Sequence, residues 1–205
     1  WEAYKIYGIS VYKYTSFYEL GQWVTSRNYK DVFGDGTVSY NPEKNVLTLN
    51  NAQLSGISAK TLILRLVGEN SIIYNPIGSL SNGAAILATD LTVRGSGSLN
   101  INPGKMRSNY YYQGIRISSG GSYTQESGTV TISGNHAGIA GKPDWDEESA
   151  NFALHFNGGT LICNLQEPVV NPVFSASALD GIVNLDVADG GKLTLTYNFN
   201  DATQK

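Results

Sequence analysis

Apolar and polar residues alternate in short runs along most of this chain. Between residues 43 and 196, one pattern recurs: a small or turn-forming residue, then two apolar residues that stand two positions apart. The segments are EKNVLTLN (43–50), GENSIIYN (68–75), GSGSLNIN (95–102), ESGTVTIS (126–133), NGGTLICN (157–164) and DGGKLTLT (189–196). A period of two is typical of β-strands, in which successive side chains point to opposite faces. We therefore expect an all-β protein.

The stretch FNGGTLICN (156–164) can be interpreted in two ways. Taken alone, Gly158 and Gly159 between apolar runs predict a two-residue hairpin turn with antiparallel strands. Aligned with the other segments, Gly159 falls in a column of residues that tolerate positive φ, whose other members are Asn45, Asn70, Gly97, Gly128 and Gly191. This recurrence favours a stack of repeats over a single hairpin.

Further columns follow the turn column at fixed distances. Two are apolar and face the same way: Leu47, Ile72, Leu99, Val130, Leu161 and Leu193, then Leu49, Tyr74, Ile101, Ile132, Cys163 and Leu195. Between them lies a column suited to a half-exposed surface: Thr48, Ile73, Asn100, Thr131, Ile162 and Thr194. After them come Asn50, Asn75, Asn102, Ser133, Asn164 and Thr196, which predict a ladder of stacked side-chain amides at a corner.

Two more short strands precede most of the turns in a constant order. One series is LILRLV (62–67), DLTVR (90–94), FALHF (152–156) and IVNLDV (182–187), and the other is GI (56–57), AAI (84–86), GIRI (114–117) and AGIA (137–140). Three strands per repeat and a corner glycine predict a single-stranded right-handed parallel β-helix of about five to six coils. The alternative is an antiparallel β-sandwich, which explains each glycine turn but not the asparagine ladder.

The first part of the chain differs from the repeats in being rich in aromatic residues. Residues 1–37 are expected to cap the first coil, because an open stack of strands must cover its apolar end and its unpaired edge. We expect a strand over 4–14, with one or two helical turns as one option within 15–24. Most aromatic side chains here are predicted to belong to the core of the cap, and contact with carbohydrate is the alternative for Trp1 and Trp23. Residues 38–205 would then form one repeat domain.

The composition narrows the possible functions. The 14 basic residues are scattered and the net charge is -3, so neither nucleic acid nor an anionic membrane is expected as a partner. The sequence contains no apolar run long enough to span a membrane. The single cysteine, Cys163, lies in an apolar strand pattern and is predicted to be a buried thiol. The oligomeric state does not follow from the sequence.

The run WVTSRNYKDVFGDGTVSYNPEKNVLTLNNAQLSG (23–56), with the later DLTVRGSGSLNI and GTVTISG, resembles a family of secreted proteins from gut Bacteroidetes and Firmicutes. These proteins carry pectate-lyase-like right-handed β-helix repeats and are often labelled carbohydrate-binding domains. The resemblance extends from about residue 23 to residue 196. It implies a secreted or cell-surface protein, and we expect that a signal peptide preceding Trp1 has been removed.

The strands offer little for catalysis. Glycoside hydrolysis needs an acid and a base carboxyl group facing one bond, and the repeats contain no Asp-Asp pair. Arg116 should project outward between inward-facing Ile115 and Ile117, as a lyase base would. The equivalent positions in neighbouring repeats, however, are Leu87 and Ala140, so a solvated arginine is expected. We therefore expect a non-catalytic carbohydrate-binding or adhesin-like module. The alternatives are a polysaccharide lyase or glycoside hydrolase acting on uronate-containing glycan, and a structural solenoid spacer.

Two segments break the repeat and hold the candidate binding residues. The segment PGKMRSNYYYQ (103–113) contains three consecutive tyrosines, and KPDWDEES (142–149) combines a tryptophan with acidic residues. Flat aromatic rings beside polar groups suit sugar recognition, so the glycan-binding candidates are Tyr110, Tyr111, Tyr112, Arg116, Trp145 and Asp146. No cofactor is expected, although Asp144, Asp146 and Glu147 are weak candidates for binding Ca²⁺ because they lack the spacing of a known calcium loop.

Overall fold

The computed structural model shows an all-β protein and describes residues 4–15, 18–74, 84–102, 113–134, 137–141, 151–166, 177–180, 182–187 and 192–198. The strands are β1 (Ile6–Tyr14), β2 (Glu19–Thr25), β3 (Val38–Asn41), β4 (Val46–Asn50), β5 (Gln53–Leu54), β6 (Gly56–Ala59), β7 (Thr61–Val67), β8 (Glu69–Ile73), β9 (Ala84–Gly95), β10 (Ser98–Asn102), β11 (Gln113–Gln125), β12 (Thr129–Gly134), β13 (Ala137–Ala140), β14 (Asn151–Phe156), β15 (Thr160–Gln166), β16 (Ser177–Asp180), β17 (Ile182–Val187) and β18 (Lys192–Asn198). The prediction of an all-β protein is confirmed.

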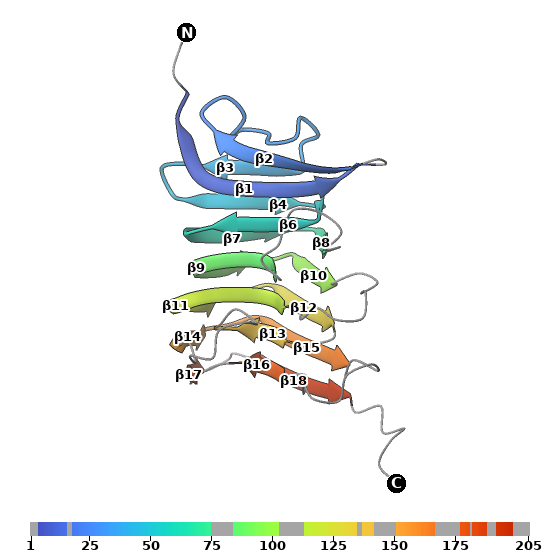
Figure 1. The fold of residues 1–205 in the computed structure, drawn as a ribbon, viewed down its shortest axis with the longest axis vertical. Coiled ribbons are helices and arrows are strands. Elements are labelled where there is room, and N and C mark those ends of the chain that lie inside the picture. Colours follow the sequence, from blue (N-terminus) through green and yellow to red (C-terminus); the bar gives the residue numbers. More distant parts are fainter. Residues whose placement is uncertain are drawn as a thin grey trace.

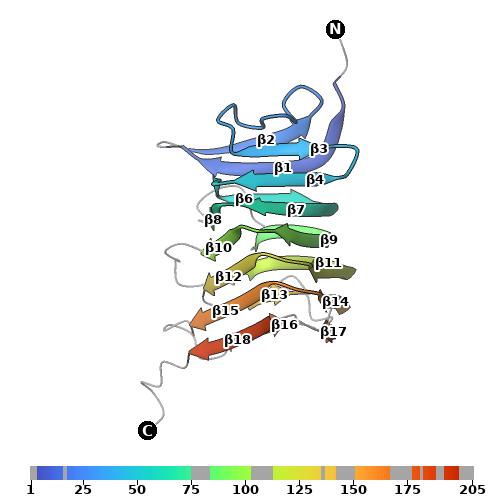
Figure 2. The same cartoon turned by 180° about the vertical axis from the view of Figure 1, so that it is seen from behind.

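The strands form two sheets. One has twelve strands, with a main path β16-β13-β11-β9-β6-β1-β2 and a branch that includes β3, β4, β7, β14 and β17. The other has six strands in the order β18-β15-β12-β10-β8-β5, and all its pairs are parallel. Figures 1 and 2 show the strands of successive repeats one above another along the long axis.

The strands on either side of Gly158 and Gly159 lie in different sheets. β14 pairs in parallel with β11 and β17, whereas β15 pairs in parallel with β12 and β18. The two strands do not pair with each other, so the local prediction of a hairpin at this site is wrong. Gly159 has a φ of 84°, and a Cβ atom there would lie 2.4 Å from the carbonyl oxygen of Gly128. This glycine therefore allows the corner to stack closely on the preceding repeat.

The structure corrects the alignment of two segments. Leu99 pairs with Asn70 and Ile101 pairs with Ile72, so the segment at 68–75 is shifted by two residues from the predicted register. Gly68, with a φ of 65°, is therefore the corner residue in place of Asn70. The segment at 43–50 lies in the other sheet, because β4 pairs with β7 and not with β8.

These shifts also change the predicted asparagine ladder. Asn102 lies beside Ile73, Asn50 lies in the larger sheet, and Asn75 lies outside the described residues. Ser133, Asn164 and Thr196 do occupy one register position, as expected. The prediction of a continuous ladder of amides through all the repeats is therefore wrong.

The N-terminal segment forms an antiparallel hairpin. β1 pairs with β2 on one side and with β6 on the other, and both pairings are antiparallel. Residues 19–25 are a strand, so helical turns there are not found. Ile9, Val11 and Val24 are buried in the core, as a cap over the first repeat requires.

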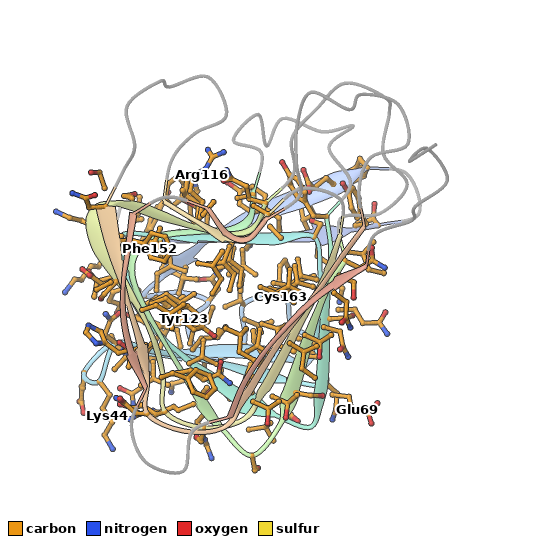
Figure 3. The ribbon with its side chains drawn as sticks, turned by 90° about the horizontal axis from the view of Figure 1, so that it is seen from below. Lys44, Glu69, Arg116, Tyr123, Phe152 and Cys163 are labelled. Carbon is orange, nitrogen blue, oxygen red and sulfur yellow. The ribbon has the colours of Figure 1, made fainter. Side chains whose placement is uncertain are left out.

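The core lies between the sheets and runs along the stack. Inward positions of β7, β9, β12 and β15 contribute buried leucine, isoleucine and valine side chains, and Figure 3 shows Tyr123, Phe152 and Cys163 in this interior. Packing against the next repeat buries each inward row on both sides, which a single repeat could not do.

Candidate functional site

Arg116 is the predicted binding residue that the structure describes. It lies on β11 and extends away from the core in Figure 3, while Ile115 and Ile117 are fully buried, as predicted. Its pairing with Leu87 and Ala140 also confirms the predicted register. The residue is only 7% exposed, so the expectation of a solvated arginine is wrong.

The surroundings of Arg116 limit what it can do. Its Nε donates a hydrogen bond to Oε1 of Gln113 at 2.6 Å, and Gln113 is itself buried. An arginine held in this way has little surface to offer to a large ligand. Arg116 pairs with Ala140 on β13, and Ala140 pairs with Asp180 on β16. Asp180 therefore lies two strands away from Arg116 at the same register position. Arg116 therefore presents no exposed guanidinium group to a ligand.

The other predicted binding residues lie outside the described residues. These are Tyr110, Tyr111, Tyr112, Trp145 and Asp146, together with the calcium candidates Asp144 and Glu147. Within the part of the chain that the structure describes, no group of three or more His, Cys, Asp or Glu side chains could hold a metal ion. The Ca²⁺ prediction is not tested by this finding.

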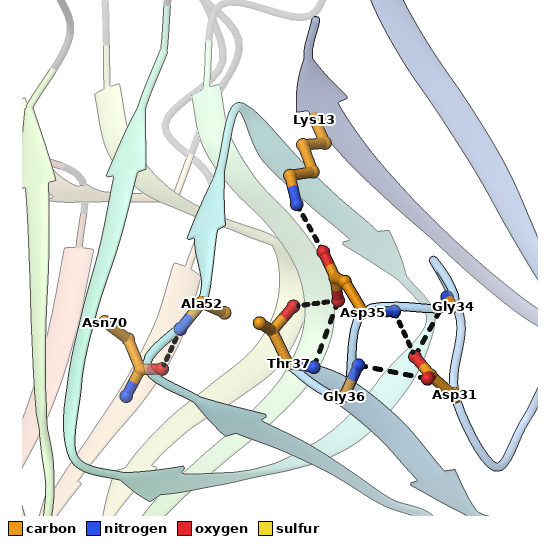
Figure 4. Close-up of polar contacts among 8 residues, drawn as sticks. All are labelled: Lys13, Asp31, Gly34, Asp35, Gly36, Thr37, Ala52 and Asn70. Atoms are coloured by element: carbon orange, nitrogen blue, oxygen red, sulfur yellow. Dashed lines mark hydrogen bonds and ion pairs between the residues drawn. The ribbon is translucent and has the colours of Figure 1, made fainter.

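Two aspartates near the N-terminal hairpin form a structural cluster (Figure 4). Asp31 Oδ1 accepts hydrogen bonds from the backbone N–H groups of Gly34 and Asp35 at 3.0 and 3.1 Å, and Oδ2 accepts one from Gly36 at 3.0 Å. Asp35 pairs with Lys13 and accepts hydrogen bonds from the backbone and side chain of Thr37. Both carboxylates therefore hold a turn in place.

The pKa of Asp35 reflects these contacts. Burial alone would raise it, but the hydrogen bonds from Lys13 and Thr37 outweigh burial and lower the pKa from 3.8 to about 2. A carboxyl group with so low a pKa stays ionised near neutral pH and cannot donate a proton there. Asp35 is therefore unsuited to act as a general acid.

The interior contains a polar pair that serves the fold. The Tyr123 hydroxyl donates to Gln125 Oε1 at 2.8 Å, and Gln125 Nε2 donates to the carbonyl oxygens of Gly128 and Thr160 at 3.1 and 2.9 Å. Burial, and secondarily the nearby Cys163, raises the pKa of Tyr123; burial also raises the pKa of Cys163 to about 12. These groups are closed off from ligands.

Exposed large apolar side chains gather on the N-terminal hairpin. Trp23 is 58% exposed, Tyr18 is 62% exposed and Tyr4 is 51% exposed, and Ile6 and Leu20 are exposed on the same hairpin. Trp23 was predicted to belong to the core of the cap, and that prediction is wrong; Trp1 lies outside the described residues. Other aromatic residues do pack together, since the Tyr7 ring contacts those of Tyr29 and Tyr40.

The reason for the exposure of Trp23 is its place in the sheet. β2 is the last strand of the main path and pairs only with β1, so its outward side chains have strand neighbours on one side alone. Trp23 lies opposite Ser10, while the inward-facing Val11 and Val24 fill the core. The sequence pattern ELGQWVT (19–25) does not show which residues face in, because it lacks clear alternation.

Charged side chains are concentrated on the outer face formed by β4, β7, β9, β11 and β14. Arg94 and Glu126 approach to 3.8 Å, and Asp90 Oδ1 accepts a hydrogen bond from Ser122 Oγ at 3.0 Å. His155 shares its register with Thr92 and Asp186, whereas Arg65 lies beside Arg94 and belongs to another column.

Comparisons of the chain with protein-family models, with curated proteins and with solved structures found no match. Among the described residues there is no helix of the length and apolar character needed to cross a membrane.

Proposed function

We propose that this chain is a right-handed parallel β-helix and that it acts as a non-catalytic carbohydrate-binding module of a secreted or cell-surface protein. The fold proposal is supported by the parallel pairing of successive repeats in both sheets, for example β12 with β15 and β14 with β17. The functional proposal agrees with the resemblance to secreted pectate-lyase-like repeat proteins.

The observation that carries the functional proposal is the set of exposed aromatic side chains on β1, β2 and their flanking residues. Tyr4, Tyr18 and Trp23 each expose more than half of their surface. An aromatic ring offers a flat apolar face on which the C–H face of a pyranose can stack, and the tyrosine hydroxyl and indole N–H can bond to sugar hydroxyls. The three rings lie along one hairpin, with Tyr4 and Tyr18 toward its opposite ends and Trp23 between them, so each offers a separate position for stacking.

The chemistry of the described carboxylates supports a non-catalytic role. Asp31 and Asp35 are occupied by backbone N–H groups, by Lys13 and by Thr37. Asp90 accepts hydrogen bonds from Thr61 and Ser122. Glycosidic cleavage needs two carboxyl groups that face one bond, with one of them protonated. These residues do not provide such a pair.

Binding to a panel of plant and host glycans, followed by titration calorimetry on any ligand found, tests the proposal. Trp23→Ala should weaken binding by about tenfold, which equals about 1.4 kcal/mol. Lys44→Ala is the control, because Lys44 is exposed in the turn between β3 and β4 and not on the β1–β2 hairpin. Figure 3 shows Lys44 directed away from the core. Circular dichroism would verify that both variants are folded.

Two results would contradict the proposal. Binding of no glycan by the wild-type protein would argue against a carbohydrate-binding module. Equal binding by the wild type and Trp23→Ala would show that Trp23 does not contact the glycan. Release of unsaturated uronides or of reducing ends from pectins would overturn the non-catalytic part and favour the lyase or hydrolase alternative.

A further inference from the structure

The outer face of the six-stranded sheet carries an array of side chains that are mostly small and polar, with two isoleucines among them. The register of β8, β10, β12 and β15 places these side chains in three columns, which we call the polar face. They are Glu69, Ser98, Thr129 and Thr160; Ser71, Asn100, Thr131 and Ile162; and Ile73, Asn102, Ser133 and Asn164. Each member is half-buried or exposed, whereas the residues between them are buried.

The polar face is almost free of charge. Hydroxyl and amide groups make up most of it, and Glu69 at one margin is its single charged member among these strands. Figure 3 shows Glu69 directed away from the molecule and Cys163 directed into it. On β18, Lys192 and Thr194 continue the first two columns by register. Charged residues thus stand at the two ends of the first column and not within it.

The neutrality of the polar face is not a general property of the strands. Threonine and serine suit outward positions of any sheet, and the charged face of β7, β9 and β11 also contains them. That face nevertheless carries Arg65, Arg94 and Glu126. The same architecture therefore has one charged outer face and one neutral outer face, and only the neutral face repeats its chemistry from strand to strand.

The side chains of the polar face retain hydrogen-bonding capacity. Within the described part of the chain, no hydrogen bond between protein groups involves a side-chain hydroxyl or amide of this face. A hydroxyl both donates and accepts, and a carboxamide provides two donors and an acceptor. Such groups match the hydroxyl groups of a sugar. An acidic glycan would instead require arginine or lysine opposite its carboxylates or sulfates.

The spacing of the array favours a ligand with its own regular repeat. Neighbouring members lie about 4.8 Å apart across the strands and about 7 Å apart along them. The sheet forms one side of the cross-section in Figure 3. The N-terminal hairpin adjoins its β5 end, where the Ser55 N–H donates to the Tyr12 carbonyl at 2.8 Å.

From this arrangement we infer that the polar face binds a neutral, ordered polysaccharide, with its hydroxyl and amide columns set against the regular hydroxyl groups of the polysaccharide surface. This inference rests on the proposed function and adds the class of ligand and the face that recognises it. Soluble acidic glycans are not ligands of this face, because its positions on β8, β10, β12 and β15 include no cation opposite to their charge.

Co-sedimentation with insoluble probes tests the inference. The wild-type protein should sediment with microcrystalline cellulose or with insoluble chitin, which are neutral and ordered, and should not be competed off by soluble polygalacturonate. Thr131→Glu places a charge at the centre of the polar face and should lower the partition coefficient at least tenfold. If Thr131→Glu fails to fold, Asn100→Asp takes its place. This variant makes a smaller change at an exposed position and should also lower the partition coefficient.

Thr92→Glu is the matched control. Thr92 is also a half-buried, outward threonine within a strand, but it lies on the charged face. We expect its partition coefficient to stay within twofold of the wild type. Equal losses for Thr131→Glu and Thr92→Glu would overturn the inference.

The failure of the inference can be told apart from the failure of the proposed function. If the wild type binds a soluble glycan through Trp23 but does not sediment with either insoluble probe, the inference is wrong and the proposed function stands. If the protein binds no glycan in any form, both are wrong.

Discussion

Asn70 occupies a position that the following repeats fill with Leu99, Val130 and Leu161. It is buried, but its carboxamide is fully used: Oδ1 accepts the Ala52 N–H at 2.9 Å, and Nδ2 donates to the carbonyl oxygens of Val67 and Ser98 at 3.1 and 3.0 Å. Figure 4 shows the contact with Ala52. A buried polar side chain is tolerated when it is satisfied in this way. Asn70 therefore links three neighbouring strands where the other repeats rely on apolar packing.

Asp35 provides a prediction at the same scale. Its folded-state pKa is about 2 and its ordinary value is 3.8, so the ionised carboxylate stabilises the fold above about pH 4, and this contribution is lost as pH falls toward 2. In urea titrations across this range, Asp35→Asn should be less stable than the wild type at pH 6, and the difference should shrink toward pH 2. Lys13→Met removes the hydrogen bond from Lys13 to Asp35. The stability of this variant should therefore change less with pH than that of the wild type. A difference that does not change with pH would contradict the prediction.

The corner glycines determine how one element can lie on the next. The Ser98 N–H donates to the Gly68 carbonyl at 2.9 Å, the Thr129 N–H donates to that of Gly97 at 3.1 Å, and the Thr160 N–H donates to that of Gly128 at 2.9 Å. A Cβ atom on Gly97 would lie 2.5 Å from the Gly68 carbonyl oxygen. Side chains at these corners would push the repeats apart, so the requirement for glycine is steric as well as conformational.

Two glycine variants separate the steric requirement from the conformational one. Gly120 and Gly159 have similar φ values of 77° and 84°, but a Cβ atom on Gly120 meets no atom within 4 Å. Gly120→Ala should cost about 1 kcal/mol from backbone strain alone. Gly159→Ala should cost about 1–3 kcal/mol more, because its new methyl group collides with the Gly128 backbone. Guanidinium unfolding would measure both, and equal losses would show that close stacking at this corner is unimportant.

Across the whole molecule, the two sheets enclose one core that continues from repeat to repeat. Buried side chains extend from Val11 in the N-terminal hairpin to Cys163 in β15. Among its polar members, Tyr123 donates a hydrogen bond to Gln125, and Gln125 donates to the carbonyl groups of Gly128 and Thr160. The core is therefore continuous through the described repeats.

The thiol of Cys163 can report on the integrity of this core. It is fully buried, and burial raises its pKa to about 12, so it is both inaccessible and protonated at pH 8. In the native protein it should not react with a thiol reagent, and its labelling with increasing urea should follow the loss of β-sheet circular dichroism. Fast labelling without denaturant would show that the C-terminal part of the core opens independently.

The sequence by itself determined the strand content, the inward columns of the later repeats and the register of Arg116 with Leu87 and Ala140, because alternation and glycine turns are local signals. It misplaced the segments at 43–50 and 68–75, since asparagine resembles a turn residue and only pairing with the neighbouring strand shows that Gly68 is the corner. It also misjudged Arg116 and Trp23, because exposure depends on which strands lie on each side. The alternation along the sequence already aligned Asn100, Thr131 and Ile162 in one column of the polar face. The continuity of the polar face, however, depends on the register between strands. That register is set by long-range backbone pairing and side-chain packing, which only the tertiary structure decides.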